Sequence, residues 1–164
     1  MTLQEFFLKQ KEAIRGRSRE VFTLLRPEHM DWKPEKGALS VGEILRHLWA
    51  SEVGVRQCAL EGSFAYYETR IPKGLRAAMG MPGTLEEELE NIERVHGETL
   101  AAVANRPENF FDEERANPGL GFRRKVAVIL FGINEHEIHH RAQLMTYLRM
   151  LGTPAPEPFK KLKS

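Results

Sequence analysis

The sequence has a single cysteine, Cys58, and lacks both a long apolar run and the basic, apolar and small-residue segments of an export signal. One thiol excludes an internal disulfide and fits a reducing compartment. No stretch approaches the roughly 20 apolar residues that a membrane-spanning helix needs. These absences predict a cytoplasmic protein that does not insert into a membrane.

An excess of charge of one sign is lacking as well. The 24 lysine and arginine residues are offset by 23 acidic residues, which gives a formal net charge of +1. Without a broad positive field, we expect neither specific nucleic-acid binding nor attraction to an anionic membrane. Basic clusters occur at Arg15, Arg17 and Arg19 and in the terminal KKLK. Such short runs are typical of solvated faces or tails.

Alternation of period two, internal repeats and sustained heptads are also absent, whereas apolar residues recur at helical spacing in four segments. The length of 164 residues fits one domain over residues 1–152, followed by an irregular tail rich in proline and lysine over residues 153–164. The predicted fold class is all-α, a four-helix bundle with a long crossover connection between helices 2 and 3. The expected helices cover residues 3–25, 40–61, 84–105 and 125–151.

Local signals support these boundaries. In two places a hydroxyl residue precedes a glutamate by three positions, the pattern of a capping box, at Ser40–Glu43 and Thr84–Glu87. The connection over residues 62–83 contains several prolines and glycines and no sustained period, which suits a crossover. The stretch RPENFFDEERANPGLGF is predicted to be a loop.

The segment HEIHH, from His136 to His140, admits three interpretations. H-E-x-x-H is the pattern of zinc proteases, in which Glu137 would be the general base. E-x-x-H is the spacing found in di-iron carboxylate bundles. In the third interpretation two imidazoles lie four residues apart and Glu137 is a bystander.

Helical geometry separates the histidines from one another. At about 100° per residue, His136 and His140 fall inside the apolar stripe of the last helix, whereas His139 lies to its side. His47 lies at the margin of the inward face of the second helix, and His96 points inward from the third. Two imidazoles at i and i+4 with a third from a facing helix can form an open His₃ site for Zn²⁺, Ni²⁺ or Fe²⁺. Ordinary hydrogen-bonded core histidines are the alternative.

The protease and di-iron interpretations lack supporting residues. No histidine follows His140, and the only acidic residue beyond it is Glu157, so a protease would have no good third ligand. A di-iron site needs inward glutamates from several helices. The candidates are all expected on the flanks of their stripes: Glu43, Glu52, Glu93 and Glu137. Histidines facing inward and glutamates facing sideways favour a mononuclear site.

Two motifs resemble those of the DinB family of four-helix-bundle metalloproteins. DWKPEKGALSVGEILRHLWASE is similar to the family's W-x-P loop, serine-capped helix and histidine, and NEHEIHHRAQLMTYLRMLG is similar to its H-x-x-H-H-R-G-Q-L helix. The resemblance covers most of residues 1–152. It implies that His47, His136 and His140 are the metal ligands. Ala142 departs from the family's usual glycine, and because alanine is small, close helix contact is retained.

The resemblance implies a metal-dependent enzyme that acts on a small molecule. The leading hypothesis is an S-transferase that joins a low-molecular-weight thiol to an electrophile, with the thiol as cosubstrate. Alternatives are a hydrolase that activates water at the same site and a non-catalytic, metal-stabilised dimeric bundle. Glu137, His96 and Gln143 are candidates for proton handling or for supporting the ligands. A homodimer is a further expectation from the family, with Trp49 as a residue that could serve its interface.

Overall fold

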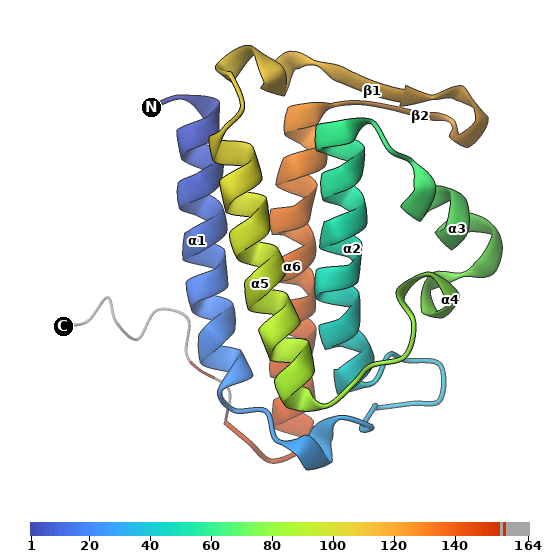
Figure 1. Cartoon of the computed structure of the whole chain (residues 1–164). Helices are drawn as coiled ribbons and strands as arrows, with labels where there is room; N and C mark the ends of the chain where they lie inside the picture. Colours follow the sequence, from blue (N-terminus) through green and yellow to red (C-terminus); the bar gives the residue numbers. More distant parts are fainter. Residues whose placement is uncertain (155, 157–164) are drawn as a thin grey trace.

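A computed structural model describes residues 1–154 and 156. Its four long helices are α1 (Leu3–Phe22), α2 (Val41–Glu61), α5 (Leu85–Ala104) and α6 (Val126–Met150), which form the bundle in Figure 1. The predicted all-α four-helix bundle is therefore confirmed. Most of the tail predicted over residues 153–164 lies outside the described residues.

Side-chain caps explain where the helices begin. In the predicted capping box of α2, the Ser40 amide donates to Glu43 Oε2 at 2.8 Å and the Glu43 amide donates to Ser40 Oγ at 3.2 Å. Thr84 caps α5 in the same way with Glu87, as predicted. At the other end of α2, Gly62 has a φ of 71°, a left-handed conformation that glycine adopts without steric strain.

The connectivity makes this bundle differ from a simple up-and-down arrangement. Figure 1 shows α1 and α6 running in one direction and α2 and α5 in the other. Each of α1 and α2 packs against both α5 and α6. Because α2 and α5 are parallel, the chain between them must return along the whole bundle, which it does through the predicted crossover. This connection contains two short helices, α3 (Ala65–Lys73) and α4 (Leu75–Met79), which the sequence pattern did not reveal.

The stretch before α6 also differs from the predicted loop. Two four-residue strands, β1 (Glu114–Asn117) and β2 (Phe122–Lys125), pair antiparallel with Glu114 opposite Lys125 and Asn117 opposite Phe122. Three 3₁₀ turns cover Pro27–His29, Glu108–Asp112 and Pro118–Leu120. The strands are short and mostly polar, so they carry no apolar alternation from which to predict them. In Figure 1 the hairpin lies across one end of the bundle and extends toward α3.

The interior has two apolar ends and a polar middle. One hydrophobic cluster gathers residues from the start of α1 and α6 and the end of α2 and α5, including Phe7, Cys58, Val103 and Leu130. The other gathers residues from the opposite helix ends, including Val21, Ile44, Ile92 and Leu144. Between them each of the four long helices contributes buried polar side chains: Lys11, Arg15, Ser18, His47, Ser51, Glu52, His96, Thr99, Asn134, Glu137 and His140.

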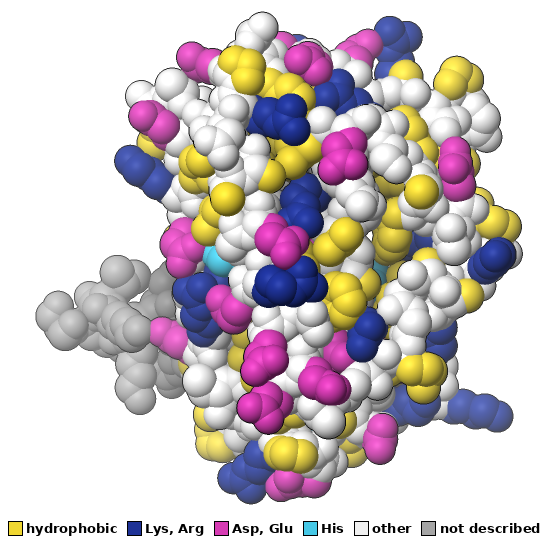
Figure 2. Space-filling view, in the orientation of Figure 1, with side chains coloured by type: hydrophobic (Ala, Val, Ile, Leu, Met, Phe, Trp, Pro, Cys, Tyr) yellow, Lys and Arg dark blue, Asp and Glu magenta, His cyan; other side chains and the backbone are white. Residues whose placement is uncertain are grey.

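The burial of Arg15 corrects the expectation that the basic cluster of α1 is a solvated face. Arg15 is 2% exposed and belongs to the polar middle, whereas Arg17 and Arg19 are exposed. On the face of the molecule seen in Figure 2, acidic and basic side chains are intermingled. No helix in the described part of the chain is long and apolar enough to cross a membrane.

Candidate metal centre

Three histidines from two helices converge in the polar middle of the bundle. His47 comes from α2, and His136 and His140 come from adjacent turns of α6. One ring nitrogen from each lies within 4.8 Å of the other two. The Nε2 atoms of His47 and His136 are 2.8 Å apart, and the three ring centroids are 4.5–4.8 Å from one another. We call these residues the histidine triad.

Burial keeps the triad uncharged. It lowers the pKa of His47 to about 3 and that of His136 to about 2, with smaller contributions from neighbouring positive groups. The pKa of His140 is also lowered by burial. Neutral imidazoles have a free lone pair, the form in which histidine binds a metal. In a tetrahedral site, nitrogens that each lie about 2.1 Å from the ion are about 3.4 Å apart. The triad could therefore hold a divalent cation.

A chain of hydrogen bonds orients His140. The Tyr147 hydroxyl donates to the Leu39 carbonyl at 3.1 Å, so it accepts from the Gln143 amide nitrogen at 3.0 Å. The amide oxygen of Gln143 then faces Nδ1 of His140 at 2.9 Å. An oxygen can only accept, so Nδ1 carries the proton and the lone pair of His140 lies on Nε2. Supporting bonds of this kind fix the ring and tautomer of metal-binding histidines.

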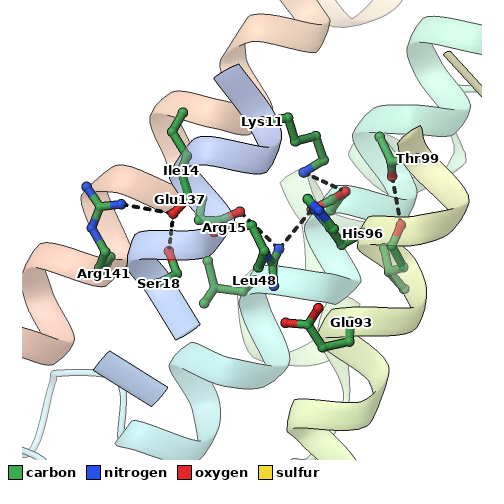
Figure 3. Close-up of polar contacts among 12 residues, drawn as sticks. Lys11, Ile14, Arg15, Ser18, Leu48, Glu93, His96, Thr99, Glu137 and Arg141 are labelled. Carbon is green, nitrogen blue, oxygen red and sulfur yellow. Dashed lines mark hydrogen bonds and ion pairs between the residues drawn. The ribbon is translucent and has the colours of Figure 1, made fainter. Parts of the chain in front are cut away.

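Two glutamates occupy positions that correct the sequence analysis. Glu52 and Glu137, expected on helix flanks, are 4% and 3% exposed. Lys11 Nζ lies 2.9 Å from Glu52 Oε1, and Arg15 Nη2 lies 2.9 Å from Glu137 Oε2 and 3.7 Å from Glu52 Oε2. We call these four residues the ionic cluster, and Figure 3 shows Lys11 and Arg15 reaching into it from α1. Burial would raise the pKa of Glu52, but Lys11 and Arg15 outweigh it and leave that pKa lowered.

Four residues considered in the sequence analysis have partners within the chain. Glu137, the general base of the protease pattern, pairs with Arg15 through Oε2, while its buried Oε1 has no hydrogen bond to a described residue. His96 is buried and lies 2.7 Å from Glu12 Oε2, so its ring has a carboxylate partner outside the triad. His139 is exposed, as expected, with its ring against that of His140 at 4.8 Å. Trp49 packs within the chain and donates to Glu88 Oε2 at 2.7 Å.

A cavity of about 320 Å³ opens beside His136. It lies between α2, α3, β2 and α6, and its lining includes Ser51, Glu52, Tyr66, Arg70, Phe122 and Gly132. Tyr66 seats α3 on α2 because Gly54 has no side chain there: a Cβ at Gly54 would lie 2.3 Å from Tyr66 Cγ. Sequence analysis missed this part of the site, since α3 and β2 lie in segments predicted to be irregular.

Comparisons with known proteins agree with this architecture. The sequence profile of the DinB superfamily matches residues 10–144. The crystal structure of a DinB-like protein, YjoA from Bacillus subtilis, superposes with a TM-score of 0.72 at 20% identity and covers 92% of this chain and 95% of that one. YfiT from Bacillus subtilis is described as a probable metal-dependent hydrolase with an unusual four-helix bundle topology. It superposes with a TM-score of 0.68 at 13% identity and covers 92% of this chain and 88% of that one. Among curated proteins, none matches the chain.

Proposed function

The chain belongs to the DinB superfamily, and from that premise we propose that it is a metal-dependent enzyme in which the histidine triad holds one divalent cation, Zn²⁺, Ni²⁺ or Fe²⁺. The observation that carries the proposal is the gathering of three neutral imidazole nitrogens within 4.8 Å, beside a cavity. Three protein ligands leave at least one coordination position for another molecule, which is the pattern of catalytic rather than structural sites.

The proposed reaction is transfer of a low-molecular-weight thiol to a small electrophile. A bound cation would lower the pKa of a thiol or of water at the open position. Once a thiol has lost its proton it needs no protein base to attack. Of the two carboxylates in the cavity lining, the buried one, Glu52, is paired with Lys11, and the other, Glu135, is exposed to solvent. The hydroxyl of Tyr67, also in the lining, stays protonated because burial raises its pKa to about 12.

Hydrolysis at the same site is the second candidate. Its support is the likeness to YfiT, which is described as a probable metal-dependent hydrolase. The purified protein, loaded with each of the three metals, should be assayed with glutathione plus monochlorobimane and separately with 4-nitrophenyl acetate. Metal-dependent loss of thiol supports transfer, whereas metal-dependent release of nitrophenol alone supports hydrolysis. A protein that binds metal and gains melting temperature but runs neither reaction is the non-catalytic bundle.

The ligand assignment has its own test. We expect His140→Ala to lose its metal, from about one equivalent to below a tenth, because two imidazoles hold a cation far less tightly than three. The matched control is His139→Ala, which removes the neighbouring exposed ring and should keep its metal. Elemental analysis after gel filtration measures both. Stoichiometric metal in His140→Ala would show that the assignment is wrong.

A further inference from the structure

The cavity beside the triad carries positive charge that the protein does not neutralise. We propose that it binds a small organic carboxylate, with Arg70 and Arg124 holding the carboxylate group next to the histidine triad. This inference rests on the function proposed above, because it names the substrate class for the same site. It depends on the charge, shape and polar atoms of the lining.

Arg70 is the main reason for the proposal. It comes from α3, lines the cavity and makes no ion pair with any described residue. Its guanidinium lies 6.0 Å from the centre of the Tyr66 ring, above the wall of the cavity. By contrast, the arginines of the neighbouring helix α2 have carboxylate partners: Arg46 lies 2.8 Å from Glu88, and Arg56 lies 2.8 Å from Glu98. An exposed guanidinium at the mouth of a cavity is suited to two-pronged binding of a carboxylate.

The charge of Arg70 reaches the triad. After burial and the other histidines, it is among the groups that lower the pKa values of His47 and His136. If the triad holds a dication, Arg70 adds a third positive charge on the same side of the bundle. Arg70 and His136 line the same cavity, and positive groups that face one cavity repel one another unless an anion lies between them. A ligand with a negative group would relieve that repulsion.

The remaining lining suits a carboxylate attached to a ring-sized apolar body. Arg124, on β2, lies over the Phe122 ring at 5.8 Å and has no carboxylate partner among the described residues. The walls include Val55, Tyr67, Phe122, Ile129 and Ile133, and one exposed acid, Glu135, also borders the cavity. With Glu52 already paired, two arginines face one free carboxylate, which leaves the lining positive.

Two further features leave room and a polar atom for the ligand. The Tyr66 hydroxyl is buried and lacks a hydrogen bond of good geometry, although Ser51 and Arg70 lie near it. A buried hydroxyl without a partner is unfavourable, and a ligand oxygen could supply the missing bond. Gly132 also lines the cavity, and a Cβ built there meets nothing within 4 Å. The space above this turn of α6 is open to a ligand.

Benzoate and benzamide form a matched pair of probes, since they share a ring and differ in charge. Saturation-transfer NMR would measure both with the full chain as purified and again after chelation of its metal. In each state we expect benzoate to bind about tenfold more tightly than benzamide, as a charge-assisted bond to arginine allows. The benzoate preference should shrink between 50 mM and 1 M NaCl, because salt screens exposed charges. Equal binding of the two probes at low salt overturns the proposal.

Variants locate the site. Arg70→Gln should lower benzoate affinity to that of benzamide, and Arg70→Lys should retain part of it. The matched control is Arg149→Gln, which removes the same charge from the far end of α6 and should change nothing. Gly132→Leu should weaken both probes by filling the cavity. Equal effects of Arg70→Gln and Arg149→Gln would overturn the proposal.

The chelated state separates this inference from the proposed function. If the protein fails to bind metal but still prefers benzoate through Arg70, the metal proposal fails and the carboxylate site stands. If it binds one metal through the triad and treats the two probes alike, the carboxylate inference fails and the metal proposal stands.

Discussion

The histidine triad and the ionic cluster lie at the same level of the bundle, between the two hydrophobic clusters, yet they satisfy their burial differently. In the ionic cluster, two cations from α1 face two carboxylates from α2 and α6. In the triad, three groups of the same kind face one another, and none offers an opposite charge.

This difference shows which of the two buried polar groups has its charges balanced within the chain. Atoms without a hydrogen bond occur in both, including Glu137 Oε1 and His47 Nδ1. The charges of the ionic cluster nevertheless compensate each other. The triad has no such compensation: apart from the contact between His47 Nε2 and His136 Nε2, its ring nitrogens offer lone pairs that a proton or a metal can use. Burial lowers the pKa of its rings and so disfavours the proton. The charges of the ionic cluster are therefore balanced within the fold, whereas the triad is the group that we propose to bind a ligand.

The largest expected effect comes from breaking the ionic cluster. Glu52→Gln removes a buried carboxylate that faces both Lys11 and Arg15. An uncompensated buried charge should lower the free energy of unfolding by about 3–5 kcal/mol. The control is Glu93→Gln, at an exposed pair with Arg19, where the loss should stay below about 1 kcal/mol. Urea unfolding measures both, and similar losses in the two variants would mean that the ionic cluster is not a stabilising unit.

An intermediate loss in the free energy of unfolding is expected when the metal-free protein is brought to acidic pH. The folded-state pKa of His136, about 2, lies below the unfolded value of about 6.5. The unfolded state therefore binds more protons below pH 6.5, and stability is lost as the pH falls from there. At pH 5 this amounts to about 2 kcal/mol from His136.

Urea unfolding of the chelated protein at pH 7.5 and pH 5, compared with His136→Gln, isolates that contribution. The variant should lose about 2 kcal/mol less than the wild type over this interval. Glu52 does not interfere, because its lowered pKa places its own loss below pH 4.5. An identical pH dependence in wild type and variant would mean that His136 is not held neutral by the fold.

Some features of the fold and of the candidate site could be predicted from the sequence because they depend on local patterns. Capping boxes and apolar stripes are local, so Ser40, Thr84 and the four long helices were predictable. His136 and His140 share a face by spacing alone, and the structure brings His47 to them across α2 and α6. Their role as ligands is the proposal made above.

What escaped prediction depends on partners distant in the chain. Glu52 and Glu137 are buried because Lys11 and Arg15 reach them from α1, and a stripe defined by apolar residues cannot show that pairing. The cavity is formed partly by Tyr66 and other residues of α3 and β2, elements too short for a periodic pattern. Burial of charge and the shape of the cavity are tertiary properties.

The smallest expected effect concerns the hydrogen bond by which Gln143 orients His140 within the triad. Gln143→Leu removes the oxygen that accepts from His140 Nδ1 and should weaken metal binding about tenfold, the lower end for such supporting bonds. Gln143→Glu keeps an acceptor at that place and should retain the affinity. Competition with a chelator of known affinity measures both. Because the bond fixes a tautomer rather than neutralising a charge, the unfolding free energy of the metal-free protein should change far less than in Glu52→Gln. Equal metal affinity in the leucine and glutamate variants would show that the Gln143 oxygen does not orient His140.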